Sequence, residues 1–179
     1  MTFDQKIQIW NTLGTWLAAL ATLAAVIVAL YLSARAEQLK LDLRVGLRKI
    51  IQGVTNTPEE CVCFEVTNSG LHPITVTSCG WIIGKGKRRR LLLQNPTIRY
   101  SSSLPIELAY GKQATFMISF TEAPEWLSEF SKNLDRDRLN AELKSLRAFV
   151  YTSIGKTIEI KPETSLVGRL RSARLDTQS

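Results

Sequence analysis

A long stretch near the N-terminus carries no charged side chain. It covers residues 7–34, and the part from 12 to 32 reads TLGTWLAALATLAAVIVALYL. A helix of about 20 apolar residues is long enough to cross about 30 Å of membrane hydrocarbon. Trp10, Trp16 and Tyr31 lie toward the two ends of this stretch, where aromatic rings favour the level of the lipid headgroups. The sequence therefore predicts an N-terminal transmembrane helix within residues 1–34.

Two other interpretations of this stretch are weaker. A cleavable signal peptide has a shorter apolar core, and its positive charges precede that core rather than follow it. A buried helix of a soluble protein is usually shorter than this apolar run.

The charges that flank the apolar stretch predict its orientation. Before it the only basic residue is Lys6, which Asp4 partly offsets. The basic residues that soon follow it are Arg35, Lys40, Arg44, Arg48 and Lys49. Short loops rich in Lys and Arg stay on the cytoplasmic side of a membrane. We therefore expect a single-pass membrane protein, with the N-terminus outside and the C-terminal domain in the cytoplasm.

Small residues recur at every fourth position of the apolar stretch. Gly14, Ala18 and Thr22 form one such stripe on a helix. Small side chains let two membrane helices approach closely, so the stripe is consistent with a homo-oligomer. Alanine is also common in membrane anchors that do not associate, and that interpretation stays open.

After a short linker, residues 35–38, the hydrophobic period changes to two. Apolar residues alternate with polar residues or glycine from 39 to 47, which predicts a strand with one buried face. Further strands separated by turn residues are predicted at 61–68, 74–83, 90–94, 112–120 and 147–161, the last as a hairpin, with an edge segment near 104–108. Strands at this spacing predict a mainly β domain over residues 39–162, an immunoglobulin-like β-sandwich.

One segment of this domain has a helical period instead. Its apolar residues recur at three- and four-residue spacing, and they are Trp126, Leu127, Phe130, Leu134, Leu139, Leu143 and Leu146. We expect one amphipathic helix over about 124–146 that packs on the edge of the sandwich, with a docking face for a partner as the alternative. Residues 163–179 are expected to form a basic tail.

Three patterns of turn residues resemble those of a known group of proteins. VTNSGLHPITV contains Asn-x-Gly-x-x-Pro, LPIELAYGKQATFMISF contains Leu-Pro-x-x-Leu-x-x-Gly, and FVYTSIGKTIEI contains a Gly-Lys hairpin turn. They resemble the patterns of small, uncharacterised bacterial single-pass membrane proteins with a cytosolic immunoglobulin-like domain. The resemblance covers most of the chain and implies the same fold and the same anchor in a bacterial inner membrane, but no catalytic residue. The Cys and Trp spacing of antibody domains is absent, and Trp81 is expected at the end of its strand with no disulfide to pack against.

The segment GKGKRRR concentrates positive charge on one turn. Its basic residues are Lys85, Lys87, Arg88, Arg89 and Arg90. If the first strand leads away from the membrane, strand alternation places this turn about 25–35 Å from the bilayer. The same count puts the inserted helix and the tail at this end, and the tail contributes Arg169, Arg171 and Arg174. The basic turn, the inserted helix and the tail therefore form one candidate interaction surface.

Four interpretations of the basic turn are open: a solvated tip, or a site for an acidic protein surface, for nucleic acid or for lipid. The formal net charge of +7 suits an anionic partner. Lipid is disfavoured because the potential of a membrane surface decays within about 8–10 Å. Nucleic acid is disfavoured because no aromatic residues are interleaved with the basic ones for base stacking. Among ligands we therefore favour a protein with an acidic surface.

No pattern predicts catalysis, a cofactor or a metal. His72 is the single histidine and lies in an expected turn. The spacing of His72 from Cys61, Cys63 and Cys79 matches no common zinc site. The odd number of cysteines suits a reducing compartment. The glycines of the basic turn lack the order of a phosphate-binding loop.

The sequence therefore predicts a membrane-anchored cytoplasmic binding or scaffolding module rather than an enzyme. The alternative is a small membrane-acting effector, of the defence or toxin kind, whose transmembrane helices assemble and perturb the bilayer. Polar residues along one helix stripe would favour the effector, and Thr15 and Thr22 are the residues that offer this.

Overall fold

The computed structural model of this chain describes residues 3–36, 39–52, 55–97, 99 and 101–176. It divides the chain into two compact units, Met1–Gln38 and Leu39–Ser179. The expected linker, residues 35–38, lies partly in helix and partly outside the described residues, because the N-terminal helix continues to Ala36.

The first unit is one long helix, α1, which runs from Phe3 to Ala36. Its segment Trp10–Ser33 is long and apolar enough to cross a membrane, and none of that segment is buried. The leucines and valines of this segment expose 49–66% of their surface. A helix that is apolar all round, and exposed all round, is suited to lipid rather than to water.

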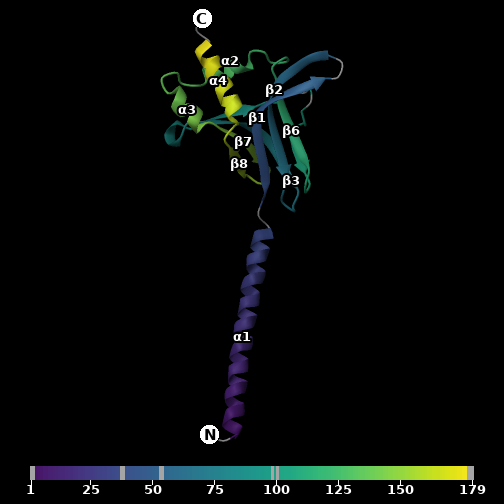
Figure 1. Cartoon of the computed structure of the whole chain (residues 1–179), viewed down its shortest axis with the longest axis vertical. Helices are drawn as coiled ribbons and strands as arrows, with labels where there is room; N and C mark the ends of the chain where they lie inside the picture. The colour runs from purple at the N-terminus through teal and green to yellow at the C-terminus, as the bar shows by residue number, and fades with distance from the viewer. Residues whose placement is uncertain (1–2, 37–38, 53–54, 98, 100, 177–179) are drawn as a thin grey trace. The chain divides into compact units, whose positions relative to one another are not determined.

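The second unit is built mainly from antiparallel strands (Figure 1). Its strands are β1 (Leu41–Gln52), β2 (Thr55–Asn68), β3 (Ile74–Ile83), β4 (Arg90–Gln94), β5 (Ile106–Leu108), β6 (Gln113–Ser119), β7 (Arg147–Thr152) and β8 (Thr157–Ile160). Its helices are the short 3₁₀ turn η1 (Gly86–Arg88) and the α-helices α2 (Trp126–Lys132), α3 (Leu139–Ser145) and α4 (Thr164–Asp176).

The strands form two sheets. One has the order β1-β2-β6, and the other has the order β4-β3-β7-β8, with β5 pairing to β3. In the first sheet the register brings Val45 opposite Phe64, and Phe64 opposite Phe116. Because side chains alternate between the two faces of a strand, this register puts the apolar residues of all three strands on one face.

The core lies between the two sheets and takes side chains from both. The predicted apolar faces are confirmed: Leu41, Leu43 and Val45 of β1 are buried, and so are the alternating residues of β2. Trp81 of β3 is fully buried at the centre, and its ring centroid lies 4.9 Å from that of Phe64 and 5.3 Å from that of Phe130. Trp81 lies near the end of β3, as expected, and it joins the two sheets and α2.

The inserted segment is two helices rather than the one expected over about 124–146. α2 ends at Lys132 and α3 begins at Leu139, with a turn between them. In that turn the Asp135 carboxylate accepts a hydrogen bond from the backbone N–H of Asp137 at 3.0 Å. A short polar side chain that bonds its own backbone competes with helix formation. The predicted apolar stripe is buried or half-buried, so it packs in the core.

Residues 163–179 are not the tail that we expected. Thr164–Asp176 form helix α4, and Leu166 and Leu170 on one of its faces are fully buried. Their four-residue spacing is a helical signal that the abundance of arginine obscured. α4 packs against α2 and β1, so it is part of the domain.

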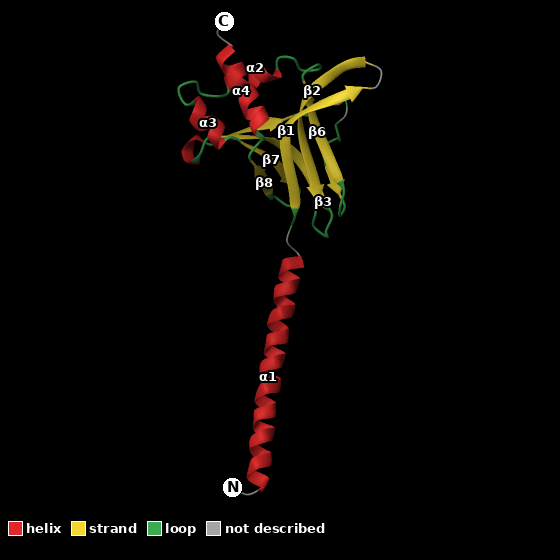
Figure 2. Ribbon diagram, in the orientation of Figure 1, coloured by secondary structure: helices red, strands yellow, loops and turns green. Residues whose placement is uncertain are grey.

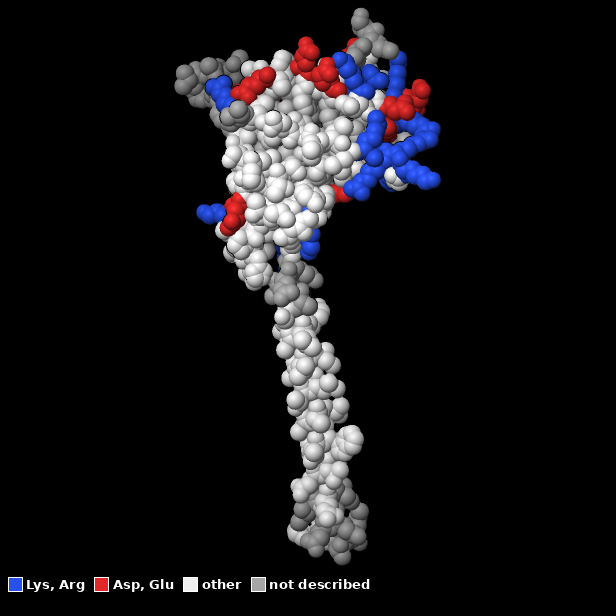
Figure 3. Space-filling view, turned by 180° about the vertical axis from the view of Figure 1, so that it is seen from behind, with Lys and Arg blue, Asp and Glu red and all other residues white. Residues whose placement is uncertain are grey.

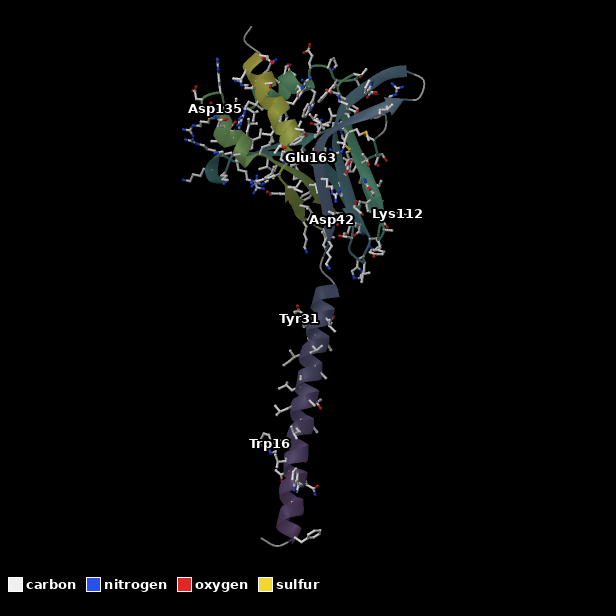
Figure 4. The ribbon with its side chains drawn as sticks, viewed as in Figure 1. Trp16, Tyr31, Asp42, Lys112, Asp135 and Glu163 are labelled. Atoms are coloured by element: carbon white, nitrogen blue, oxygen red, sulfur yellow. The ribbon has the colours of Figure 1, made fainter. Side chains whose placement is uncertain are left out.

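The domain has two ends with different contents. The entry end holds the start of β1 and three loops, residues 69–73, 109–112 and 153–156, because Leu41 pairs with Asn68, Ile74 with Leu108, and Tyr151 with Thr157. The helical end holds the β3–β4 loop and the three α-helices (Figure 2). In Figure 4, Asp42 and Lys112 lie at the entry end, whereas Asp135 lies at the helical end.

Gly80 and Gly168 provide a test of the packing of the second sheet. A Cβ on Gly80 would collide with the Leu92 carbonyl oxygen and the buried Phe149 ring, whereas a Cβ on Gly168 in α4 meets nothing within 4 Å. Gly80→Ala should lower the free energy of unfolding by about 2–3 kcal/mol or more. Gly168→Ala should raise it by about 0.5–1 kcal/mol, since alanine favours a helix. Denaturant unfolding of both variants measures the two changes, and equal effects of the two substitutions would contradict this packing.

Candidate functional site

The basic turn is held in a defined shape by two glycines and one serine. Gly84 and Gly86 have positive φ angles of 85° and 56°, which other residues adopt only with strain. The Gly84 N–H also donates to Ser145 Oγ of α3 at 3.1 Å, so a hydrogen bond connects the turn to α3. η1 then closes with the Arg89 N–H donating to the Gly86 carbonyl at 3.2 Å.

The arginines at the end of this turn are neutralised within the domain. Arg89 lies 2.6 Å from a Glu159 carboxylate oxygen, and Arg90 lies 2.6 Å from Glu142. Lys85, Lys87 and Arg88 are exposed, and they take part in none of the ion pairs formed among the described residues. The free positive charge of the turn is therefore concentrated in these three side chains.

A first cavity lies between the basic turn and α3. Its volume is about 380 Å³. The residues that line it are Gly84, Lys85, Arg88, Arg138, Ala141, Glu142, Lys144 and Ser145. Four of these are basic and one is acidic, and the acidic one already pairs with Arg90. The cavity is therefore suited to an anionic group.

A second cavity lies on the other side of Lys144, between α3 and α4. Its volume is about 630 Å³, and Lys144, Lys161 and Arg171 line it together with apolar residues. None of its lining residues is acidic. Because Lys144 lines both cavities, they form neighbouring parts of one basic surface.

We use the name basic cluster for the cations that line these cavities. They are Lys85, Arg88, Arg138, Lys144, Lys161 and Arg171. Figure 3 shows a large group of Lys and Arg side chains on one side of the domain, with a few acidic side chains among them. The sequence patterns single out three of these six residues. They miss Arg138, Lys144 and Lys161, which lie outside the basic turn and the C-terminal segment.

The other expected arginines are engaged elsewhere. Arg169 lies 3.9 Å from Glu60 of β2, and Arg174 donates to the Leu134 carbonyl at 3.1 Å. The structure therefore joins only Arg171 of the three α4 arginines to the cavities next to the basic turn.

An ion-pair network fixes the start of α4 against β1. The Arg48 guanidinium donates to both Glu163 carboxylate oxygens, at 2.9 and 2.8 Å, and to Glu65 at 3.0 Å. These bonds to Arg48 lower the pKa of Glu163. Gly46 leaves room for the Glu163 carboxylate, since a Cβ there would collide with it. The stabilisation is present above the ordinary pKa of a glutamate, and it is lost as the pH falls through the lowered value.

The three cysteines are free and buried. Burial raises the pKa of Cys63 to about 12 and that of Cys79 to about 12. Burial also raises the pKa of Cys61. Because the thiolate is the nucleophile and the metal ligand, burial makes these thiols slow to react at neutral pH in the folded domain.

The three threonine hydroxyls of α1 are bonded within the helix. The hydroxyls of Thr12, Thr15 and Thr22 donate at 2.8 Å to the carbonyls of Gln8, Asn11 and Ala18. Their protons therefore remain within the helix. Gly14 has open space around it, so a second helix could approach closely there.

Comparisons with known proteins identify no family. No family model matches the chain, and no curated protein matches its sequence. Among solved structures, the chain is weakly similar to the crystal structure of a Bordetella pertussis protein assigned as ApaA. The sequence identity is 16%, the TM-score is 0.32, and the match covers 68% of this chain and 87% of the other.

Two substitutions test the expected packing of α1 against a second copy. Gly14→Ile and Ala18→Ile place bulky side chains on the stripe, so each should reduce the signal of a membrane dimerisation assay severalfold. Leu20→Ile, on the opposite side of the helix, is the matched control and should leave the signal unchanged. If all three variants associate like the unchanged chain, the stripe does not mediate association.

Proposed function

We propose that this chain is a membrane-anchored binding module of bacteria that recognises an acidic protein surface. α1 crosses the inner membrane with its N-terminus outside, and the β domain lies in the cytoplasm. The basic cluster and the neighbouring turn form the binding site. The observation that carries this proposal is the lining of the two cavities, which contains six basic side chains and one acidic side chain.

The proposed class of the domain is immunoglobulin-like. Its sheets, β1-β2-β6 and β4-β3-β7-β8, have the order that results when strands A, B and E face strands C′, C, F and G. Trp81 is buried on β3, the strand that corresponds to C, where such domains carry a buried tryptophan. Phe64 lies beside it in place of a disulfide. α2 and α3 are then an insertion between strands E and F.

Two features support the anchor and its orientation. The apolar segment Trp10–Ser33 is long enough to cross the hydrocarbon and exposes its side chains all round. The excess of basic residues after this segment favours a cytoplasmic location for the domain.

Binding to a protein agrees better with the cavities than binding to nucleic acid. Single-stranded nucleic acids are held by aromatic rings on which the bases stack, and neither cavity is lined by an aromatic side chain of a described residue. Carboxylates of a partner could enter the cavities and pair with Arg88, Arg138 or Arg171, whose guanidinium groups match a carboxylate in shape. We propose binding rather than catalysis, because positive charge is the main feature that these side chains provide.

Neutralising the free cations of the basic turn tests this site. Replacing Lys85, Lys87 and Arg88 by Ser should leave the fold intact, since exposed substitutions change stability by only about 0.5 kcal/mol. Recovery of partner proteins from bacterial membranes with the full chain as bait should fall severalfold. Binding by the unchanged chain should also weaken steeply with salt, because the screening length falls from about 10 Å at 0.1 M to about 3 Å at 1 M.

A matched control removes the same amount of charge from the entry end. Replacing Lys40, Lys112 and Lys156 by Ser changes the net charge equally but leaves the basic cluster unaltered. This variant should recover the same proteins as the unchanged chain. If the two variants lose binding to the same extent, recognition depends on net charge alone and the proposed site is wrong.

A further inference from the structure

The three loops of the entry end each expose one large apolar side chain. Leu71 is 68% exposed, Tyr110 is 65% exposed and Ile154 is 65% exposed. A scattered exposed leucine needs no explanation, but three such residues on three loops of one end form a pattern.

Hydrogen bonds hold these loops at one end of the sheets. The buried Asn68 side chain donates at 2.8 Å to the carbonyls of His72 and Leu108, and its carbonyl oxygen accepts from the Gly70 N–H at 2.9 Å. The backbone carbonyl of Asn68 accepts from the Gly111 N–H at 2.8 Å. One residue therefore connects the loop of Leu71 to the loop of Tyr110.

The third loop is closed in a similar way. The Thr152 hydroxyl bonds to the backbone of Lys156, and the Gly155 N–H donates to the Thr152 carbonyl at 3.0 Å. The Ser153 N–H donates to the Thr75 carbonyl on β3 at 2.9 Å. Much of the backbone in these turns is thus already bonded, which lowers the cost of moving their tips into a less polar environment.

Each apolar tip lies close to a positive charge. Lys112 and Lys156 follow Tyr110 and Ile154 by two residues, and the exposed Lys40 receives hydrogen bonds at its carbonyl from the loop that contains Leu71. The three loops contain no acidic residue in the sequence. Asp42 and Glu107, the acidic residues next to them, lie on β1 and β5. Apolar side chains with lysines around them are typical of surfaces that bind anionic lipid bilayers.

The chain that leads into β1 keeps this end close to the lipid headgroups. The apolar segment ends at Ser33, α1 continues to Ala36, and β1 begins at Leu41. At about 1.5 Å per helical residue and 3.5 Å per extended residue, β1 can begin no farther than roughly 22 Å from the end of that segment. The headgroup layer occupies about 5–8 Å of this distance.

We infer that the entry end of the domain docks on the anionic lipid surface next to its own transmembrane helix. Leu71, Tyr110 and Ile154 enter the headgroup region, and Lys40, Lys112 and Lys156 contact lipid phosphates. This docking rests on the proposed anchor but not on the proposed protein partner. It fixes the domain with the helical end, and hence the basic cluster, directed away from the bilayer.

Depth measurements on the full chain in lipid nanodiscs test this inference. Single-cysteine variants Leu71→Cys and Ile154→Cys carry an environment-sensitive fluorophore, and the nanodiscs contain anionic lipid with a quencher on the acyl chain. Leu93→Cys is the matched control, since Leu93 is 71% exposed on β4. The buried native cysteines react slowly with the label. Labels at 71 and 154 should be quenched severalfold more than the label at 93.

The two sets of charge variants separate this inference from the proposed partner site. Replacing Lys40, Lys112 and Lys156 by Ser should reduce quenching at position 154 severalfold, as should a change to uncharged lipid, whereas replacing Lys85, Lys87 and Arg88 should not. If position 154 is quenched no more than position 93, the entry end does not touch lipid. Failure of the chain to enter nanodiscs would overturn both the anchor and the docking.

Discussion

The indole of Trp81 lies where three parts of the domain meet. It extends from β3, contacts Phe64 of the opposite sheet, and packs against Trp126 and Phe130 of α2. The indole N–H groups of Trp126 and Trp81 both donate to the side-chain oxygen of Gln94, at 3.0 and 3.4 Å. Burial of this aromatic group holds the sheets together and fixes α2, against which α4 packs. The helical end therefore has a defined surface because of a contact in the core.

The charges of the domain follow from this arrangement. α3 is tied to the basic turn through Ser145, and α4 is tied to β1 through the ion pairs of Arg48 with Glu163. With both helices fixed, cations from four separate segments line two adjoining cavities. At the opposite end, tight loops expose apolar side chains and lysines, and Asn68 forms hydrogen bonds with two of these loops. In our account one end meets lipid and the other meets a protein.

The sequence was informative wherever a local pattern determines the structure. The apolar segment could be recognised from its length and lack of charge, and the strands from their alternating pattern. The bounds predicted for β4 agree with the structure. The pattern failed at residues 133–138, where the Asp135 turn interrupts a helical period, and in α4, where Leu166 and Leu170 are outnumbered by polar residues. The site could be predicted only in part. Arg138, Lys144 and Lys161 join the basic turn through tertiary packing, and Arg89 and Arg90 are neutralised by distant glutamates.

The side of the membrane on which the domain lies is the claim on which the rest of this account depends. Fusions of reporters after Ser179, expressed in a bacterium, measure it directly. A fluorescent protein that folds only in the cytoplasm should be bright and remain with the membrane fraction, and alkaline phosphatase, which is active only in the periplasm, should be inactive. An active phosphatase fusion together with a dark fluorescent fusion would place the domain outside the cytoplasm and contradict the account.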